Sequence, residues 1–228
     1  MGKENLRISR TGNKIHEKSN NQSNKIINCT NQIIKQIQLE YQVQLFHAKE
    51  ISLTNIINDL KATFANIEFC CEFANTKMRP DGGLLYLVSK NQIKFPILIS
   101  EVKNQGTNDL RLSEGKQKQA QGNAIERLGK NVIGLKTICL KESIFPFVCF
   151  GDGCDFAPDS KILDRVATIA QFGKLNKTHL YKEGPFDRGS FYFREKPWLA
   201  EDMFPIMMDI AKKSIAYYFA KYGEQSFI

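Results

Sequence analysis

The chain has 228 residues, of which 42% are hydrophobic and sixteen are Phe, so it can bury the core of one domain and is not a disordered polymer. Its formal net charge of +8 favours a polyanionic partner. No apolar run reaches the length of a membrane span and no signal peptide opens the chain, so we expect a cytoplasmic protein without a membrane partner.

Cysteine and histidine spacing argues against a zinc centre. No CxxC pair is present and the three His residues stand apart, whereas zinc ligands normally cluster in the sequence. We expect the cysteines to be reduced, as is usual in the cytosol. The cysteines are Cys29, Cys70, Cys71, Cys139, Cys149 and Cys154.

Residues 1–30 differ in composition from the rest of the chain. Lys and Arg outnumber Glu, Asn and Ser fill the gaps, and large apolar residues are few. Composition favours a disordered tail, while the charge favours a basic arm that orders against phosphates, and both can hold at different times. We therefore predict a basic N-terminal arm over 1–30 and one folded domain over 31–228.

The remaining pattern predicts helices and strands in mixed order. Thr54 is a candidate cap for the second helix, and Gly122 and Gly129 interrupt the third. Expected helices cover 26–48, 54–64, 116–136, 160–172 and 203–222, and expected strands cover 67–73, 84–89, 95–103 and 145–150. This arrangement indicates an α/β fold with a buried central sheet.

Three charged residues are expected to meet at one end of a hairpin. Asp81 lies in the turn before the strand 84–89, and Glu101 and Lys103 lie two apart near the end of the strand 95–103. Side chains two apart in a strand share a face, so folding the hairpin brings Asp81 beside the other two. Two neighbouring carboxylates, with the Val102 carbonyl as a third oxygen, suit a hard cation such as Mg²⁺.

The chemistry of this cluster is that of phosphate-ester hydrolysis. Mg²⁺ in such a site orients a phosphate and activates a water, and Lys103 can stabilise the negative transition state. Pro-Asp-Gly turns and Glu-x-Lys strand ends are each common structural features. Here, however, the charged residues lie at the end of the apolar strand 97–102. Because unpaired buried charge is costly, charges at this position need a functional reason.

The turn Arg79-Pro80-Asp81-Gly82-Gly83 and the segment Ser100-Glu101-Val102-Lys103-Asn104-Gln105-Gly106 resemble the catalytic core of EcoRI-type restriction endonucleases. The run Gly122-Asn123-Ala124-Ile125-Glu126-Arg127 is similar to that family's recognition segment, and the resemblance extends roughly over 50–220. PD-(D/E)xK alone marks a broad nuclease superfamily, and GNAIER at this distance after it is much more specific.

This resemblance implies a homodimeric, Mg²⁺-dependent type II enzyme with the restriction-endonuclease-like fold, a central mixed sheet flanked by helices. It implies cleavage of double-stranded DNA at a short palindrome containing AATT, leaving 5′ overhangs. Asp81 and Glu101 match the metal-binding acids, and Lys103 matches the catalytic lysine. Asn123, Glu126 and Arg127, with Ala124 in the same segment, match the residues that contact the adenines.

Two departures from the family pattern concern the outer base pair. Ile162 stands where the family's archetype has an arginine, three residues before Arg165. Gln119-Ala120-Gln121 replaces small and apolar residues just before GNAIER. An amide donates or accepts, which favours a purine preference because N7 is an acceptor on both purines. We therefore expect RAATTY slightly ahead of a fixed site such as CAATTG.

Two other functions stay open at this point. A repair or recombination nuclease shares the acid and lysine core but selects DNA by its structure, and GNAIER argues against it. A non-catalytic, sequence-specific DNA-binding module retains the fold, and the intact Asp81, Glu101 and Lys103 argue against that.

Overall fold

The computed structural model describes residues 14–69, 76–104, 114–117, 123–153, 156, 177–180, 190–194 and 196–228. Side chains are described within these ranges except at 14–20, 104, 123–127, 177–180 and 190. The helices are α2 (Lys14–Tyr41), α3 (Leu53–Thr63), α5 (Asn123–Lys136) and α7 (Ala200–Tyr222), with 3-10 turns η1 (Thr137–Cys139) and η3 (Glu224–Ser226). The strands are β1 (Gln44–Ala48), β2 (Ile51–Ser52), β3 (Lys77–Met78), β4 (Leu84–Val88), β5 (Lys94–Asn104), β6 (Phe147–Asp152), β7 (Lys177–Leu180) and β8 (Ser190–Arg194).

A mixed sheet forms the centre of the fold. Its six strands have the order β1-β4-β5-β6-β8-β7. β1, β4 and β5 are antiparallel neighbours, whereas β5, β6, β8 and β7 run parallel. β2 and β3 form a separate two-stranded sheet. This architecture confirms the expected α/β class with a central mixed sheet flanked by helices.

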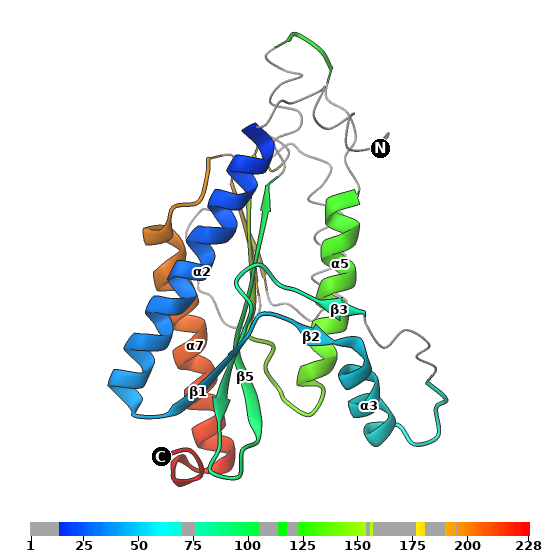
Figure 1. The fold of residues 1–228 in the computed structure, drawn as a ribbon, viewed down its shortest axis with the longest axis vertical. Helices are drawn as coiled ribbons and strands as arrows, with labels where there is room; N and C mark the ends of the chain where they lie inside the picture. Colours follow the sequence, from blue (N-terminus) through cyan, green and yellow to red (C-terminus); the bar gives the residue numbers. More distant parts are fainter. Residues whose placement is uncertain are drawn as a thin grey trace.

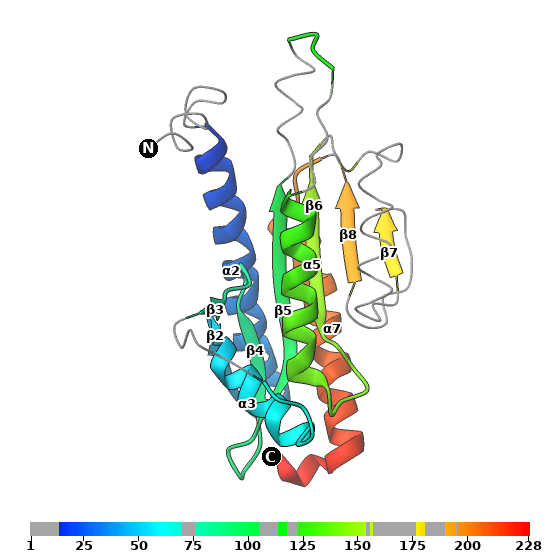
Figure 2. The same ribbon diagram turned by 90° about the vertical axis from the view of Figure 1, so that its right-hand side faces the viewer.

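Helices cover both faces of this sheet. α2 and α7 pack together on one face, and α5 lies along the other face (Figure 1; Figure 2). β5 ends at the same end of the molecule at which α2 and α5 begin (Figure 1). Side chains of the middle strands therefore alternate between two apolar cores, one against α2 and α7 and the other against α5.

A bulge in β5 sets which face its last residues occupy. Leu85 pairs with Leu98 and Tyr86 pairs with Pro96, so Ile97 is an extra residue opposite β4. Beyond this bulge, Leu98 packs in the core against α2 and α7, and Ile99 packs in the core against α5. Because the side-chain period of a strand is two, Glu101 and Lys103 lie on the α5 face with Ile99.

Residues 14–30 are helical, which their composition does not predict. α2 begins at Lys14, so the expected boundary at residue 30 lies inside a helix. Ile26 and Cys29 are fully buried in the core that α2 shares with α7, and this packing stabilises a helix that composition alone does not. The expected helix 26–48 in fact ends at Tyr41, where Gln42 takes a positive φ of 53° and β1 follows.

Other expected elements differ in detail. The strands 84–89, 95–103 and 145–150 and the helix 203–222 are confirmed within a few residues. The helix expected at 54–64 is capped by Ser52 rather than Thr54, because the Ser52 hydroxyl accepts from the Thr54 N–H at 3.2 Å. Residues 67–69 are not a strand. The rest of the strand expected at 67–73, and the helix expected at 160–172, lie outside the described residues. No described helix is long and apolar enough to cross a membrane.

Candidate active site

The turn that carries Asp81 is pinned directly onto β5. The Gly83 N–H donates to the Pro80 carbonyl at 2.9 Å, which closes the turn, and the Gly82 N–H donates to the Ser100 carbonyl at 2.9 Å. Gly83 has a positive φ of 77°, which favours glycine. A Cβ at Gly82 would lie 2.0 Å from Ser100 Oγ, so only glycine lets the turn lie this close to the strand.

Asp81, Glu101 and Lys103 meet at this junction. The Asp81 N–H donates to Glu101 Oε2 at 3.0 Å, and the Val102 N–H donates to Asp81 Oδ2 at 3.2 Å. Lys103 Nζ forms an ion pair with Glu101 Oε1 and lies 3.9 Å from Asp81 Oδ2. The three expected catalytic side chains are therefore brought together by the hairpin.

The burial of these side chains is graded. The Glu101 side chain is 2% exposed, whereas Lys103 is 20% and Asp81 is 31% exposed. Glu101 is thus shielded from solvent, whereas Asp81 is accessible to it. A buried carboxylate loses several kcal/mol of hydration, so its close contacts with Lys103 and the Asp81 N–H are needed to offset that cost.

Burial and charge also shift the acid–base behaviour of the site. Burial raises the pKa of the Glu101 carboxyl; the Lys103 ammonium opposes this rise and the Asp81 carboxylate adds to it. Burial alone would lower the pKa of Lys103, but the charges of the Glu101 and Asp81 carboxylates raise it. Burial raises the pKa of the Cys149 thiol, so Cys149 remains a neutral thiol beside the pair. When both acids are ionised, Asp81, Glu101 and Lys103 together carry a net charge of about −1. This net charge favours binding of a cation.

The two carboxylates at this junction supply part of the ligand set of a hard divalent cation. Asp81 and Glu101 supply anionic oxygens at one place, and Mg²⁺ is commonly bound by one or two carboxylates with water and phosphate oxygens completing its shell. No group of three or more His, Cys, Asp or Glu side chains is placed to hold a metal within the described part of the chain. The remaining ligands would therefore come from backbone, water or substrate.

Helix α5 lies on the face of the sheet that carries the Glu101 and Lys103 side chains. Asn131 Nδ2 lies 3.5 Å from Glu101 Oε1, a long contact on the α5 face of the sheet. The segment Asn123–Arg127 forms the start of α5. At about 1.5 Å per residue, the eight residues from Asn123 to Asn131 span roughly 12 Å of helix. The start of α5 thus lies beyond the cluster of Asp81, Glu101 and Lys103, at the end of the sheet where β5 also ends (Figure 1).

The side chains of the expected DNA-binding residues lie outside the described set. Asn123, Ala124, Glu126 and Arg127 lie in the helical backbone of α5, and their side chains are outside the described set. Gln119, Ala120, Gln121 and Arg165, together with Ile162, lie outside the described residues.

Helix α2 supplies contacts that the sequence interpretation missed. Ser23 Oγ lies 3.5 Å from Asp81 Oδ1, and Thr30 Oγ1 lies 3.3 Å from the Gly82 carbonyl. Thr30 is 1% exposed in a stripe that also contains the buried Ile26 and Ile33. A polar residue inside the apolar stripe of a helix was the signal that could have indicated such a contact.

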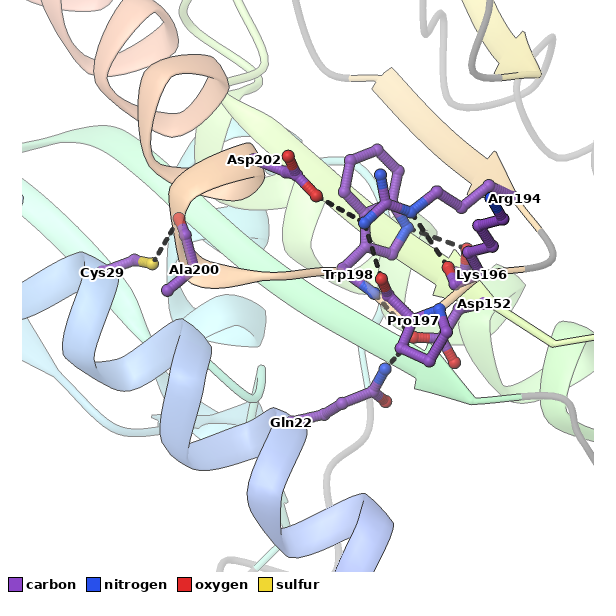
Figure 3. Close-up of polar contacts among 10 residues, drawn as sticks. Gln22, Cys29, Asp152, Arg194, Lys196, Pro197, Trp198, Ala200 and Asp202 are labelled. Carbon is purple, nitrogen blue, oxygen red and sulfur yellow. Dashed lines mark hydrogen bonds and ion pairs between the residues drawn. The ribbon is translucent and has the colours of Figure 1, made fainter.

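A second polar cluster joins α2 to the end of β6, on the face of the sheet that α2 covers (Figure 3). Asp152, 1% exposed at the end of β6, accepts hydrogen bonds from Gln22 Nε2 and from the Trp198 N–H. The Trp198 indole donates to the Gly151 carbonyl at 2.9 Å, and the Arg194 guanidinium lies over the Trp198 ring. These contacts hold the first half of α2 against the end of the sheet that carries the candidate site.

Comparison with known proteins agrees with this geometry. Residues 9–225 match the family model described as restriction endonuclease EcoRI. The chain is 31% identical over 178 aligned positions to the type II restriction enzyme RsrI of Cereibacter sphaeroides, an alignment covering 62% of this chain and 64% of that protein. It is 27% identical over 221 positions to the type II restriction enzyme EcoRI of Escherichia coli, covering 79% of each chain.

The chain thus spans just under two thirds of the length of the first relative and about four fifths of the second. The family match includes the hairpin of β4 and β5, α5 and α7 together. The chain belongs to the EcoRI restriction endonuclease family.

Proposed function

We propose that this protein is a type II restriction endonuclease that hydrolyses phosphodiester bonds in double-stranded DNA with Mg²⁺. The observation that supports this most is the meeting of Asp81, Glu101 and Lys103 where the catalytic turn contacts β5. Two relatives are named type II restriction enzymes, which supports the same reaction class.

Each residue of the cluster has a distinct role in this proposal. Asp81, Glu101 and the Val102 carbonyl hold the cation, which supplies Lewis-acid chemistry to the scissile phosphate when bound. Lys103 stays protonated because the neighbouring carboxylates raise its pKa. Its ammonium then stabilises negative charge on the phosphate in the transition state rather than accepting a proton.

Recognition is assigned to the first turns of α5. Adenine presents the N7 acceptor and the N6 amino donor in the major groove, which admits an α-helix. An Asn can satisfy both groups, a Glu accepts from N6, and an Arg donates to N7. Asn123, Glu126 and Arg127, with Ala124 against them, therefore suit a site built on AATT.

The outer base pair is assigned to a different set of residues. Ile162 has no hydrogen-bonding group for a guanine, and Gln119 or Gln121, beside Ala120, can accept or donate to either purine. Arg165 stays in the same segment as Ile162 as a phosphate or base contact. We place RAATTY ahead of CAATTG, with 5′ overhangs at the cut ends.

A palindrome read by one copy of α5 per half-site requires a two-fold homodimer. The basic segment that precedes and begins α2 would then contact DNA phosphates, since α2 begins at the end of the molecule where β5 ends (Figure 1). Sedimentation with a cognate duplex should give two chains per duplex. A strictly monomeric complex that still cuts both strands symmetrically would contradict the dimer.

Digestion of a plasmid of known sequence tests the proposed activity. In Mg²⁺ we expect discrete fragments with identical ends, and in excess EDTA we expect none. Nicking confined to junctions or flaps would indicate a structure-selective nuclease instead. Binding to the plasmid without any cleavage would indicate a non-catalytic DNA-binding module.

A further inference from the structure

The side chain of His47 contacts the turn that carries Asp81. His47 lies on β1, where it pairs with Leu85 of β4, and its Nε2 is 3.0 Å from the Gly82 carbonyl. The ring also lies close over Gly83, since a Cβ there would be 2.4 Å from Nε2. Its partner Leu85 packs in the core against α2 and α7, so His47 lies on the face of the sheet opposite to the one that carries the Glu101 and Lys103 side chains.

The chemistry of this contact defines the state of the ring. A carbonyl oxygen only accepts, so His47 Nε2 must carry the proton, either in the neutral Nε2–H tautomer or in the imidazolium. Thr30 Oγ1 approaches the same oxygen at 3.3 Å, but its single proton is shared with the Ile26 carbonyl at 3.0 Å. His47 is accordingly the better placed of the two donors.

Hydrogen bonds thus hold both peptide groups that flank the Gly82 Cα. The Gly82 N–H is fixed to the Ser100 carbonyl of β5, while the Gly82 carbonyl is held by His47 from β1 and by Thr30 from α2. Gly82 directly follows Asp81, so fixing the peptide groups on both sides of the Gly82 Cα restricts where the Asp81 carboxylate lies relative to Glu101.

We propose that His47 is a positioning residue for Asp81, which acts through the Gly82 carbonyl and touches neither metal nor substrate. This inference rests on the proposed role of Asp81 in holding the cation. Positioning matters because a displacement of about 1 Å in a catalytic group can lower the rate by roughly a hundredfold. Losing the His47 donor should therefore affect catalysis and metal use before it affects DNA recognition.

The test compares His47→Phe, which keeps a planar ring without the donor, with His47→Gln, which retains an N–H donor. We expect His47→Phe to lower the single-turnover cleavage rate by about tenfold or more and to raise the Mg²⁺ concentration for half-maximal rate. DNA affinity in metal-free buffer should stay at the wild-type value. His47→Gln should recover part of the lost rate.

Thr30→Val provides a second arm. Because both donors act on one carbonyl, the effects of His47→Phe and Thr30→Val on the rate should not be additive. Phe46→Leu is the matched control, since Phe46 is the neighbouring β1 residue, is 41% exposed, and lies near Tyr86 on the other face. It should leave rate and Mg²⁺ dependence unchanged.

A folded His47→Phe protein with the wild-type rate and Mg²⁺ dependence would overturn the proposal. Equal losses of rate, DNA affinity and thermal stability in both His47 variants would also overturn it, because they would show a merely structural role. Asp81→Asn separates this failure from failure of the proposed function. If Asp81→Asn cuts normally, the assignment of the site itself falls, whatever the His47 variants do.

Discussion

The backbone N–H of Asp81 donates to Oε2 of Glu101 at 3.0 Å. The neighbouring Val102 N–H donates in return to Asp81 Oδ2 at 3.2 Å. Each carboxylate is thus oriented by the backbone of the segment that carries the other. This reciprocal arrangement keeps two acids together that would otherwise repel, and it makes the site sensitive to small shifts of the turn.

Asp81→Ala should abolish cleavage, because it removes one anionic ligand and the acceptor for the Val102 N–H. DNA binding should survive and should tighten, since a carboxylate that repels the phosphate is gone. Single-turnover cleavage in Mg²⁺ and equilibrium binding to a cognate duplex measure the two effects. A variant that cuts at nearly the wild-type rate would remove Asp81 from the metal site.

Lys103→Ala separates rate from affinity. The ammonium is paired with Glu101 in the free protein and is expected to act on the phosphate mainly in the transition state. The cleavage rate should fall by several orders of magnitude while site recognition persists. If affinity falls as far as the rate, Lys103 is only a phosphate anchor.

Metal binding should depend on pH through Glu101. Its pKa is raised in the metal-free fold, so its proton competes with Mg²⁺ at a higher pH than for an ordinary carboxyl. At an Mg²⁺ concentration of about 100 times Kd, binding should add about 2.7 kcal/mol to the free energy of unfolding. This corresponds to a rise of roughly 5–10 °C in Tm. This increment should be present at neutral pH and shrink as pH falls through the raised pKa. Differential scanning calorimetry at several pH values measures it.

Glu101→Gln is the control for that experiment, because it cannot ionise. Its Tm should respond little to Mg²⁺ at any pH. An equal Mg²⁺-dependent rise in Tm for wild type and Glu101→Gln would place the cation elsewhere.

Gly82→Ala should be destabilising, since the added Cβ would lie 2.0 Å from Ser100 Oγ and 3.2 Å from Ile26 Cγ1. We expect a loss of about 1–3 kcal/mol in the free energy of unfolding, typical of overpacking. Combining it with Ser100→Ala removes the closest atom and should restore part of the loss. Urea unfolding of the single and double variants tests this.

Gly134→Ala in α5 is the comparison for Gly82→Ala. Its Cβ would meet only the end of the flexible Met78 side chain, and alanine is the better helix former by roughly 0.5–1 kcal/mol. It should therefore be tolerated. If Gly82→Ala is tolerated equally well, the close approach of turn and strand does not exist in solution.

The hairpin that brings Asp81, Glu101 and Lys103 together is predictable from the sequence because its signals are local. A glycine turn, two apolar runs and an acid–lysine pair two apart need no long-range information. The bulge at Ile97 was not predictable, because every residue from Phe95 to Ile99 is apolar and shows no alternation. That bulge decides that Glu101 and Lys103 face α5.

Contacts between distant elements were also beyond the sequence. Residues 14–25 have a polar composition, yet they begin a helix whose Gln22 reaches the buried Asp152 (Figure 3). His47, Ser23 and Asn131 acquire their positions only when β1, α2 and α5 pack around the hairpin. No local pattern marks such residues, since tertiary packing rather than propensity creates the contact.

Cleavage of a panel of duplexes tests the central proposal most directly. The panel carries AATT with each of the four outer base pairs, and separately an altered base pair at each AATT position. We expect Mg²⁺-dependent cleavage that requires intact AATT and favours purine–AATT–pyrimidine sites, because a degenerate outer pair costs well under the roughly 1–3 kcal/mol of a strictly read mismatch. Cleavage confined to GAATTC would show that Ile162 does not relax the outer position. Efficient cleavage of duplexes with a disrupted AATT core would contradict the recognition role of Asn123, Glu126 and Arg127.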